Sequence, residues 1–241
     1  VGLMLLPAAA DLITIYVALE LASLPVVALA AFLKAQNSST EAAVKYLLLS
    51  AVSSAVLLYG FAFIYGATGT VRLFPGEGME PSIAQALRAG GDGPFGGAAV
   101  MAGAVLATAG FGFKLSMVPF QMWTPDVYEG APTPVTTFLA VASKAAGFGA
   151  LLRFLGAMFM TEGVHEVVAE YGKSIGALLA LIAAATMTMG NLSALKQSSL
   201  KRMLAYSSIA HAGYVLIGAA TMTAAGFEAA MWYLAAYYFM N

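Results

Sequence analysis

The chain has 241 residues, of which 61% are hydrophobic and only 10% are charged, and its formal net charge is −1. A soluble globular domain is typically about 45–50% apolar and about 25% charged, so this composition excludes one. Cysteine is absent, which excludes disulfide frameworks, thiolate metal sites and iron–sulfur clusters, and the balance of 11 basic and 12 acidic residues argues against a nucleic-acid partner. The sequence therefore predicts an integral membrane protein in contact with the lipid bilayer.

The apolar runs are long enough to cross a bilayer, whose core needs about 20 residues per helix. We expect an all-α polytopic bundle. Hydropathy and helix-breaking residues predict spans at about 11–33, 42–66, 97–123, 133–159, 174–195 and 203–223, with a partial span from 227. The glycine-rich connector 66–97 is the longest polar stretch, and it contains a predicted short surface helix, Ser82 to Ala89.

Both ends of the sequence carry apolar runs that are too short to span a membrane. The first run stops at Asp11, and the last one extends only from Phe227 to Asn241. The opening run has no basic n-region or small-residue cleavage site, so it is not a signal peptide. We expect an internal fragment that is truncated within a helix at each end.

Successive spans alternate in direction, so their connectors alternate between the two membrane faces. Lys34, Asp126 and the basic segment 196–202 should share one face, predicted to be cytoplasmic, and Arg72 and Lys173 should lie on the other.

Three charged residues fall near the middle or deep inside predicted spans: Glu20, Lys114 and Lys144. On insertion scales they together cost on the order of 8–10 kcal/mol unless they are paired or hydrated. A static ion pair would satisfy Glu20 and one lysine only. Because burial disfavours the charged ammonium, the second lysine is expected to sit in water or to exchange its proton.

Prolines follow two of these charges at the same interval, Pro25 after Glu20 and Pro119 after Lys114. A proline inside a helix removes a backbone hydrogen bond and leaves a carbonyl without its partner. Pro25 is compatible with an ordinary kink, whereas the further prolines that follow Pro119 predict a broken helix. Irregular backbone at membrane depth survives only where it is buried in protein or lines a hydrated cavity, so Lys114 beside such a break indicates an ion pathway.

Two other titratable residues allow two interpretations each. Lys45 follows Glu41 by four residues, the spacing of a solvated surface ion pair, and it can also snorkel to the interface. His211 has an ordinary pKa that suits a proton relay, but a histidine beside Ser208 and Tyr214 can equally be a hydrogen-bonded packing residue.

Residues 113–135 read FKLSMVPFQMWTPDVYEGAPTPV, and this segment closely resembles the antiporter-like membrane subunits of bacterial NADH:quinone oxidoreductase, respiratory complex I, and among them the subunit N family. The segments 18–25 (ALELASLP), 143–147 (SKAAG) and 201–211 (KRMLAYSSIAH) resemble the glutamate helix, the central-lysine helix and the start of the second repeat of that family. Together these four segments extend the resemblance over nearly the whole chain.

The resemblance implies an inverted-repeat architecture, with residues 1–160 as the last helices of the first repeat, including a broken helix at about 97–123, and residues 161–241 as a truncated start of the second. It implies that Glu20 and Lys114 form a coupled pair, that Lys144 passes protons inward, and that Lys45 and His211 are accessory relay positions. The family commonly has histidine where this chain has Gln121, which cannot titrate.

The implied function is proton translocation in the bacterial plasma (inner) membrane, driven by redox chemistry in other subunits of the complex. The implied partners are the other membrane-arm subunits, and no cofactor or metal is expected in this chain. Three alternatives stay open: a subunit of a multisubunit sodium/proton antiporter, a structural scaffold without transport, and a quinone-binding subunit.

Overall fold

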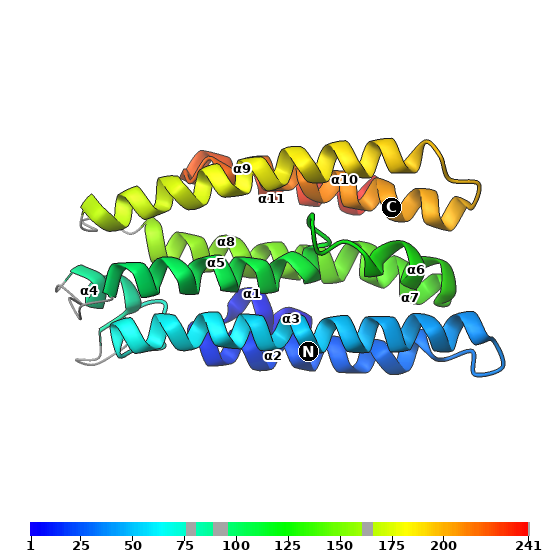
Figure 1. The fold of residues 1–241 in the computed structure, drawn as a ribbon, viewed down its shortest axis with the longest axis horizontal. Coiled ribbons are helices and arrows are strands. Elements are labelled where there is room, and N and C mark those ends of the chain that lie inside the picture. Colours follow the sequence, from blue (N-terminus) through cyan, green and yellow to red (C-terminus); the bar gives the residue numbers. More distant parts are fainter. Residues whose placement is uncertain (76–80, 89–95, 161–165, 241) are drawn as a thin grey trace.

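The computed structural model describes residues 1–75, 81–88, 96–160 and 166–240, and within these ranges the regular elements are all helices. They run roughly parallel to one axis in three tiers (Figure 1). Among the described residues, six helices are long and apolar enough to cross a membrane. The predicted all-α, polytopic fold is thereby confirmed. The elements, in chain order, are α1 (Gly2–Ala8), α2 (Leu12–Ala30), α3 (Asn37–Thr68), α4 (Ile83–Arg88), α5 (Gly96–Leu115), α6 (Trp123–Gly130), α7 (Thr133–Phe138), the π-helical turn η1 (Leu139–Ser143), α8 (Lys144–Phe159), α9 (Glu166–Ala194), α10 (Leu200–Ala220) and α11 (Ala224–Met240).

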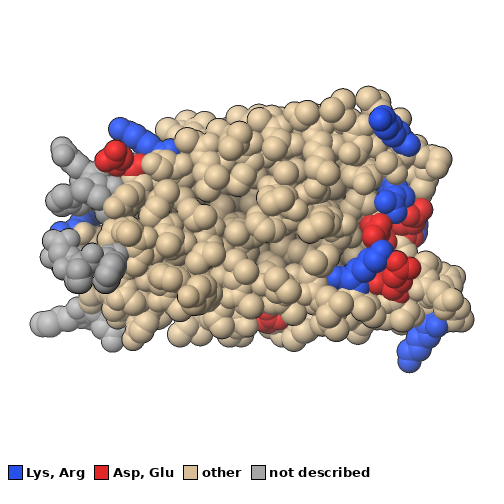
Figure 2. Space-filling view, in the orientation of Figure 1, with Lys and Arg blue, Asp and Glu red and all other residues tan. Residues whose placement is uncertain are grey.

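The charged side chains gather at the two ends of this bundle, and the surface between them is almost entirely uncharged (Figure 2). This is the pattern expected when a bilayer surrounds the middle of the molecule, because charges near the helix ends stay in contact with water. Asp126 and Arg202 form an ion pair, so the connector and the basic segment predicted to share one face do lie at the same end.

The third predicted span, 97–123, is broken, as the prolines that follow Lys114 predict. Helix α5 ends at Leu115, and a new helix, α6, begins only at Trp123. The first residue of the break, Ser116, has a φ of 61°, in the left-handed region, so the regular helix cannot continue there. The indole nitrogen of Trp123 donates a hydrogen bond of 2.9 Å to the carbonyl of Phe113, and Thr124 donates one of 2.7 Å to the Ser116 hydroxyl. The first bond gives a backbone carbonyl next to the break a side-chain donor, and the second fixes α6 against the residue where α5 ends.

The proline in α2 has a different consequence. Helix α2 passes through Pro25 and ends only at Ala30, so this position is at most a kink. Asp11 begins this helix, because its carboxylate accepts hydrogen bonds from the backbone nitrogen and the hydroxyl of Thr14, both at 2.7 Å.

Two helices begin several residues earlier than hydropathy predicts, and the opening turn of the first of them, α3, is polar. Helix α3 starts at Asn37 and has 32 residues, or about 48 Å, which exceeds a hydrocarbon core of about 30 Å. Helix α9 starts at Glu166.

The predicted surface helix is found as α4, with Ser82 and Gln85 in a reciprocal capping arrangement. Ala89, its predicted end, lies outside the described residues. The helices at the two ends of the chain, α1 and α11, pack against the bundle: α1 contacts α2 and α8, and α11 contacts α10.

The contact between α3 and α5 depends on small residues. A Cβ atom at Gly103 would lie 2.7 Å from the carbonyl oxygen of Gly60, and a Cβ atom at Gly60 would lie 2.6 Å from the backbone nitrogen of Ala107. Both obstacles are backbone atoms, which cannot move aside cheaply. Glycine therefore allows the close helix approach that is typical of membrane bundles, and it fixes the position of α5, which carries Lys114.

Gly103→Val should separate α3 from α5 and lower the free energy of unfolding by about 1–3 kcal/mol, the usual cost of overpacking. The measurement is the thermal midpoint of the full-length protein in detergent. Gly66→Val in α3, the partner helix of this contact, is the matched control, because a Cβ atom at Gly66 meets nothing within 4 Å. Equal midpoints for the two variants would contradict the close-packing explanation.

Candidate functional site

The first buried cation, Lys114, lies in the last turn of α5, immediately before the helix break. Its side chain is 2% exposed, and its ammonium nitrogen donates hydrogen bonds to the hydroxyls of Ser23 (3.1 Å) and Tyr46 (3.3 Å). The Ser23 hydroxyl donates its own hydrogen bond to the carbonyl of Leu19, at 2.8 Å. The hydroxyls thus accept from the lysine, and within the described part of the chain no carboxylate lies in ion-pair contact with it.

The second buried cation, Lys144, begins α8 directly after the π-helical turn η1. It is also 2% exposed and donates to the backbone carbonyl of Ser208 (2.7 Å) and to the Ser208 hydroxyl (2.9 Å) on α10. A π-helical turn leaves one residue out of the regular hydrogen-bond register and is frequent at functional sites. Like Lys114, Lys144 contacts no carboxylate among the described residues.

The two lysines lie on helices that touch. A Cβ atom at Gly147, one turn after Lys144, would lie 3.4 Å from the Cγ atom of Lys114. The buried side chain of Tyr128 from α6 lies close enough to interact electrostatically with Tyr46 and with Ser208. These are the hydrogen-bond partners of Lys114 and Lys144. The Tyr128 hydroxyl is buried near both of them, and it makes no hydrogen bond within the described part of the chain.

A small cavity continues this arrangement beyond Lys144. It has a volume of about 10 Å³, which is about the space that one water molecule needs. Lys144, Ser208 and His211 contribute to its lining, and His211 is joined through Nδ1 to the hydroxyl of Tyr233 by a hydrogen bond of 2.7 Å.

The structure does not bring Glu20 into this cluster. Glu20 lies near the middle of α2 and is partly exposed, and no hydrogen bond or ion pair joins it to Lys114 in the described ranges. Ser23, one turn further along α2, takes the place next to the lysine. The coupling of Glu20 with Lys114 stays a prediction from the family resemblance.

Lys45 belongs to a separate network at the charged end of the molecule. It forms the predicted ion pair with Glu41 (2.6 Å) and a second one with Asp126 (2.6 Å), while Arg202 contacts both Asp126 and Glu129 at 2.9 Å. The network connects α3, α6 and α10. Burial alone would raise the pKa of Asp126, but the hydrogen bonds from Lys45 and Arg202 outweigh it and hold that pKa below its ordinary value.

Part of this site carries no sequence signal strong enough to predict it. Ser23 follows Glu20 by three residues and Ser208 precedes His211 by three, so helical spacing places each on the face of a charged or titratable residue. Three tyrosines belong to the site only because helices that are distant in sequence pack together: Tyr46, Tyr128 and Tyr233. Gln121 is buried, and its amide nitrogen contacts the sulfur of Met189 at 2.9 Å.

The fold and the site define a polytopic membrane protein with a broken helix beside buried lysines. The sequence profile of the family described as "NADH:quinone oxidoreductase/Mrp antiporter, TM" matches residues 9–241. The chain belongs to this family.

Individual relatives agree with this assignment. The chain is 46% identical to NADH-quinone oxidoreductase subunit N of Desulforamulus reducens over 99% of its own length and 46% of the relative's. It superposes with a TM-score of 0.74 on a chain of respiratory complex I from Thermus thermophilus, with 38% identity, covering 99% of this chain and 47% of that one. A chain of the Mrp complex from Dietzia sp. matches at a TM-score of 0.76 but only 24% identity, over 93% and 38% of the two chains, so it supports the fold alone. The chain spans about half the length of the curated relatives it matches.

The ion pair between Asp126 and Arg202 can be measured with a double-mutant cycle of Asp126→Asn and Arg202→Gln. We expect a coupling energy of no more than about 1 kcal/mol, because both side chains keep about a third of their surface exposed, at 33% and 32%.

Because the pKa of Asp126 is lowered on folding, its stabilising contribution is complete above its unfolded-state pKa and disappears as the pH falls through the folded-state value. Unfolding of the full-length protein should therefore lose this part of its acid dependence in Asp126→Asn, and an unchanged dependence would contradict it. Glu41→Gln, at the more exposed edge of the network, is the control.

Proposed function

We propose that this chain moves protons through its interior as part of a membrane subunit of NADH:quinone oxidoreductase in the bacterial plasma membrane. One observation carries the proposal: Lys114 and Lys144 are buried to 2% exposure on touching helices and contact no carboxylate in the described part of the chain. An isolated charge in an apolar bundle is costly, and release of the proton removes that cost. Each lysine is thus suited to hold a proton transiently.

The proposed route runs from Lys114 through the hydroxyls of Tyr46, Tyr128 and Ser208 to Lys144. From there the small cavity leads to His211 and Tyr233. Hydroxyl groups both donate and accept, so each can pass a proton along such a chain.

Glu20 and Lys45 have different proposed roles. We propose that Glu20, which is partly exposed at the middle of α2, modulates the charge near Lys114, and that Lys45, in the ion-pair network of the charged end, holds or admits protons. The energy required is modest in size: a charge moved across about 100 mV is worth about 2.3 kcal/mol. We propose that redox chemistry in other subunits supplies it, and that this chain itself holds no redox cofactor.

The alternatives make different predictions. A sodium/proton antiporter subunit would give sodium-dependent exchange in vesicles without any redox substrate. A structural scaffold would tolerate neutral residues at both lysines, and a quinone-binding subunit would be labelled near Lys114 or Trp123 by a photoreactive quinone. Relatives named as an oxidoreductase subunit support proton translocation over these alternatives.

Lys144→Ala and Lys114→Arg in the full-length subunit should each lower redox-driven proton pumping severalfold in proteoliposomes of the parent complex. Alanine removes the proton carrier, and arginine keeps the charge but effectively cannot deprotonate. Lys34→Ala, at an exposed connector position, is the matched control and should pump normally. Undiminished pumping by both lysine variants would favour the scaffold.

Tyr128→Phe should slow proton transfer between the lysines while leaving the fold intact, because it removes only a hydroxyl group. The measurement is pumping rate together with its solvent isotope effect, which a purely structural residue would not change. Tyr59→Phe is the control, since Tyr59 is 61% exposed on the outer face of α3. A Tyr128→Phe variant that matches the control in both quantities would exclude Tyr128 from the route.

A further inference from the structure

The helix break between α5 and α6, residues 116–122, is bonded to α9 through its own backbone. The backbone nitrogen of Val118 donates a hydrogen bond of 3.0 Å to the hydroxyl oxygen of Thr186. The next residue, Pro119, has no backbone N–H group to donate. In Figure 1 this green segment rises toward the tier that α9 and α10 form. A side chain from a distant helix thus takes up a backbone donor at the middle of the break.

The hydroxyl of Thr186 is oriented to accept this bond. It donates its own proton to the carbonyl of Ile182, one turn earlier in α9, at 2.6 Å, so its lone pairs are left for Val118. Thr186 is 0% exposed. Inside a membrane bundle an N–H group without an acceptor is costly, because no lipid group can replace the lost partner. A hydrocarbon side chain of the same shape could fill this position but could not support the break.

A second contact lies on the same face of α9. Met189 follows Thr186 by three residues, and its sulfur lies 2.9 Å from the amide nitrogen of Gln121, which is 6% exposed. A thioether is a weak acceptor. The amide oxygen of Gln121 has no hydrogen-bond partner in the described part of the chain. The break therefore rests on α9 at two points, and Thr186 supplies the stronger acceptor.

Helix α9 is in turn packed closely against α10. A Cβ atom at Gly213 would lie 2.8 Å from the backbone nitrogen of Met187, the residue that follows Thr186. Such a close approach of backbones leaves little freedom for one helix to slide on the other. Because α10 carries Ser208, the acceptor for Lys144, the support of the break and the support of the second amine belong to one packed pair of helices.

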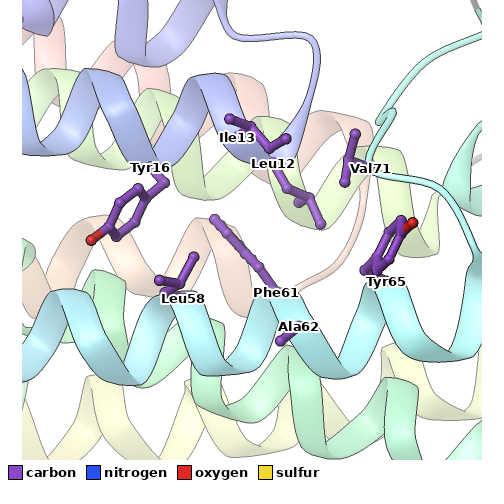
Figure 3. A pocket seen from close by; sticks show the side chains of 8 residues that line it. All are labelled: Leu12, Ile13, Tyr16, Leu58, Phe61, Ala62, Tyr65 and Val71. Carbon is purple, nitrogen blue, oxygen red and sulfur yellow. The ribbon is translucent and has the colours of Figure 1, made fainter.

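The opposite side of the bundle offers no comparable support. Figure 3 shows a pocket of about 200 Å³ between the start of α2 and the end of α3. It contains no charged side chain, and no residue of the break lines it; the lining residues are Leu12, Ile13, Tyr16, Leu58, Phe61, Ala62, Tyr65 and Val71. This pocket is separate from the break and from the contacts that hold it.

We infer that Thr186 is a positioning residue for proton transfer between Lys114 and Lys144. It holds the backbone of the break, and with it the last turn of α5, in a fixed place relative to α9 and α10. Lys114 precedes Val118 by only four residues, so a shift of the break would move its amine relative to Lys144. This role rests on the proposed function, and Thr186 acts in it through the backbone of Val118 rather than as a proton carrier.

The test replaces Thr186 in the full-length subunit within its native complex in proteoliposomes. Thr186→Val keeps the shape of the side chain but removes the acceptor, so it should lower proton pumping per NADH oxidised severalfold and shift the pH profile of pumping. Thr186→Ser keeps the hydroxyl and should restore both. Thr108→Val is the matched control, because Thr108 is 2% exposed and its hydroxyl donates to a carbonyl of its own helix, that of Ala104, at 2.8 Å.

Hydrogen–deuterium exchange of the peptide that contains Val118 measures the bond directly. Exchange should be faster in Thr186→Val than in the unaltered protein and in Thr186→Ser. If valine prevents assembly of the complex, Thr186→Ala removes the same acceptor with a smaller side chain and should give the same three changes.

The positioning role is overturned if exchange at Val118 is unchanged, if Thr186→Val pumps like Thr108→Val, or if serine fails to restore pumping. Its failure can be told from failure of the proposed function. Normal pumping by Lys114→Arg and Lys144→Ala would overturn the function, whereas impaired lysine variants beside a normal Thr186→Val would overturn the positioning role alone.

Discussion

The burial of two lysine amines in an apolar bundle is the constraint on which the rest of this structure depends. An ammonium group at the centre of a spanning helix costs about 2.5–3.5 kcal/mol on insertion scales. The usual remedy, a buried carboxylate, is not in contact with Lys114 or Lys144 in the described part of the chain. Hydroxyls and a backbone carbonyl take its place, and Ser23 and Ser208 direct their own protons to carbonyls of their helices. Each amine is thus held by acceptors that do not neutralise its charge.

Breaks in the regular helices supply space and polarity at the depth where these amines lie. Helix α5 ends one residue after Lys114, and the π-helical turn η1 ends one residue before Lys144. Helix α2 differs from these two helices: it continues through Pro25, and it carries no fully buried cation. Irregular backbone therefore occurs where a charged side chain is buried. This coincidence is expected if the function of the helix breaks is to supply polar backbone groups near the buried charges rather than to improve helix packing.

The ion-pair network at the polar end connects the broken helix to its surroundings. Asp126 on α6 contacts Lys45 on α3 and Arg202 on α10, and Tyr128, half a turn away on the same short helix, faces the partners of both lysines. The ion-pair network and the neighbourhood of the buried lysines are thus joined by a helix of only eight residues.

The sequence by itself determined the membrane-spanning, all-α class, the approximate spans, the break after Lys114 and the identity of the buried charges, because hydropathy, proline spacing and charge are local properties of the chain. Only the tertiary structure decided which polar groups meet these charges. Ser23, rather than Glu20, contacts Lys114, and Ser208 contacts Lys144 across 64 positions in sequence. Tyr128 lies between the two through the docking of α6. Such contacts depend on how helices distant in sequence pack and rotate against one another, which the glycines at the helix contacts permit but no single segment specifies.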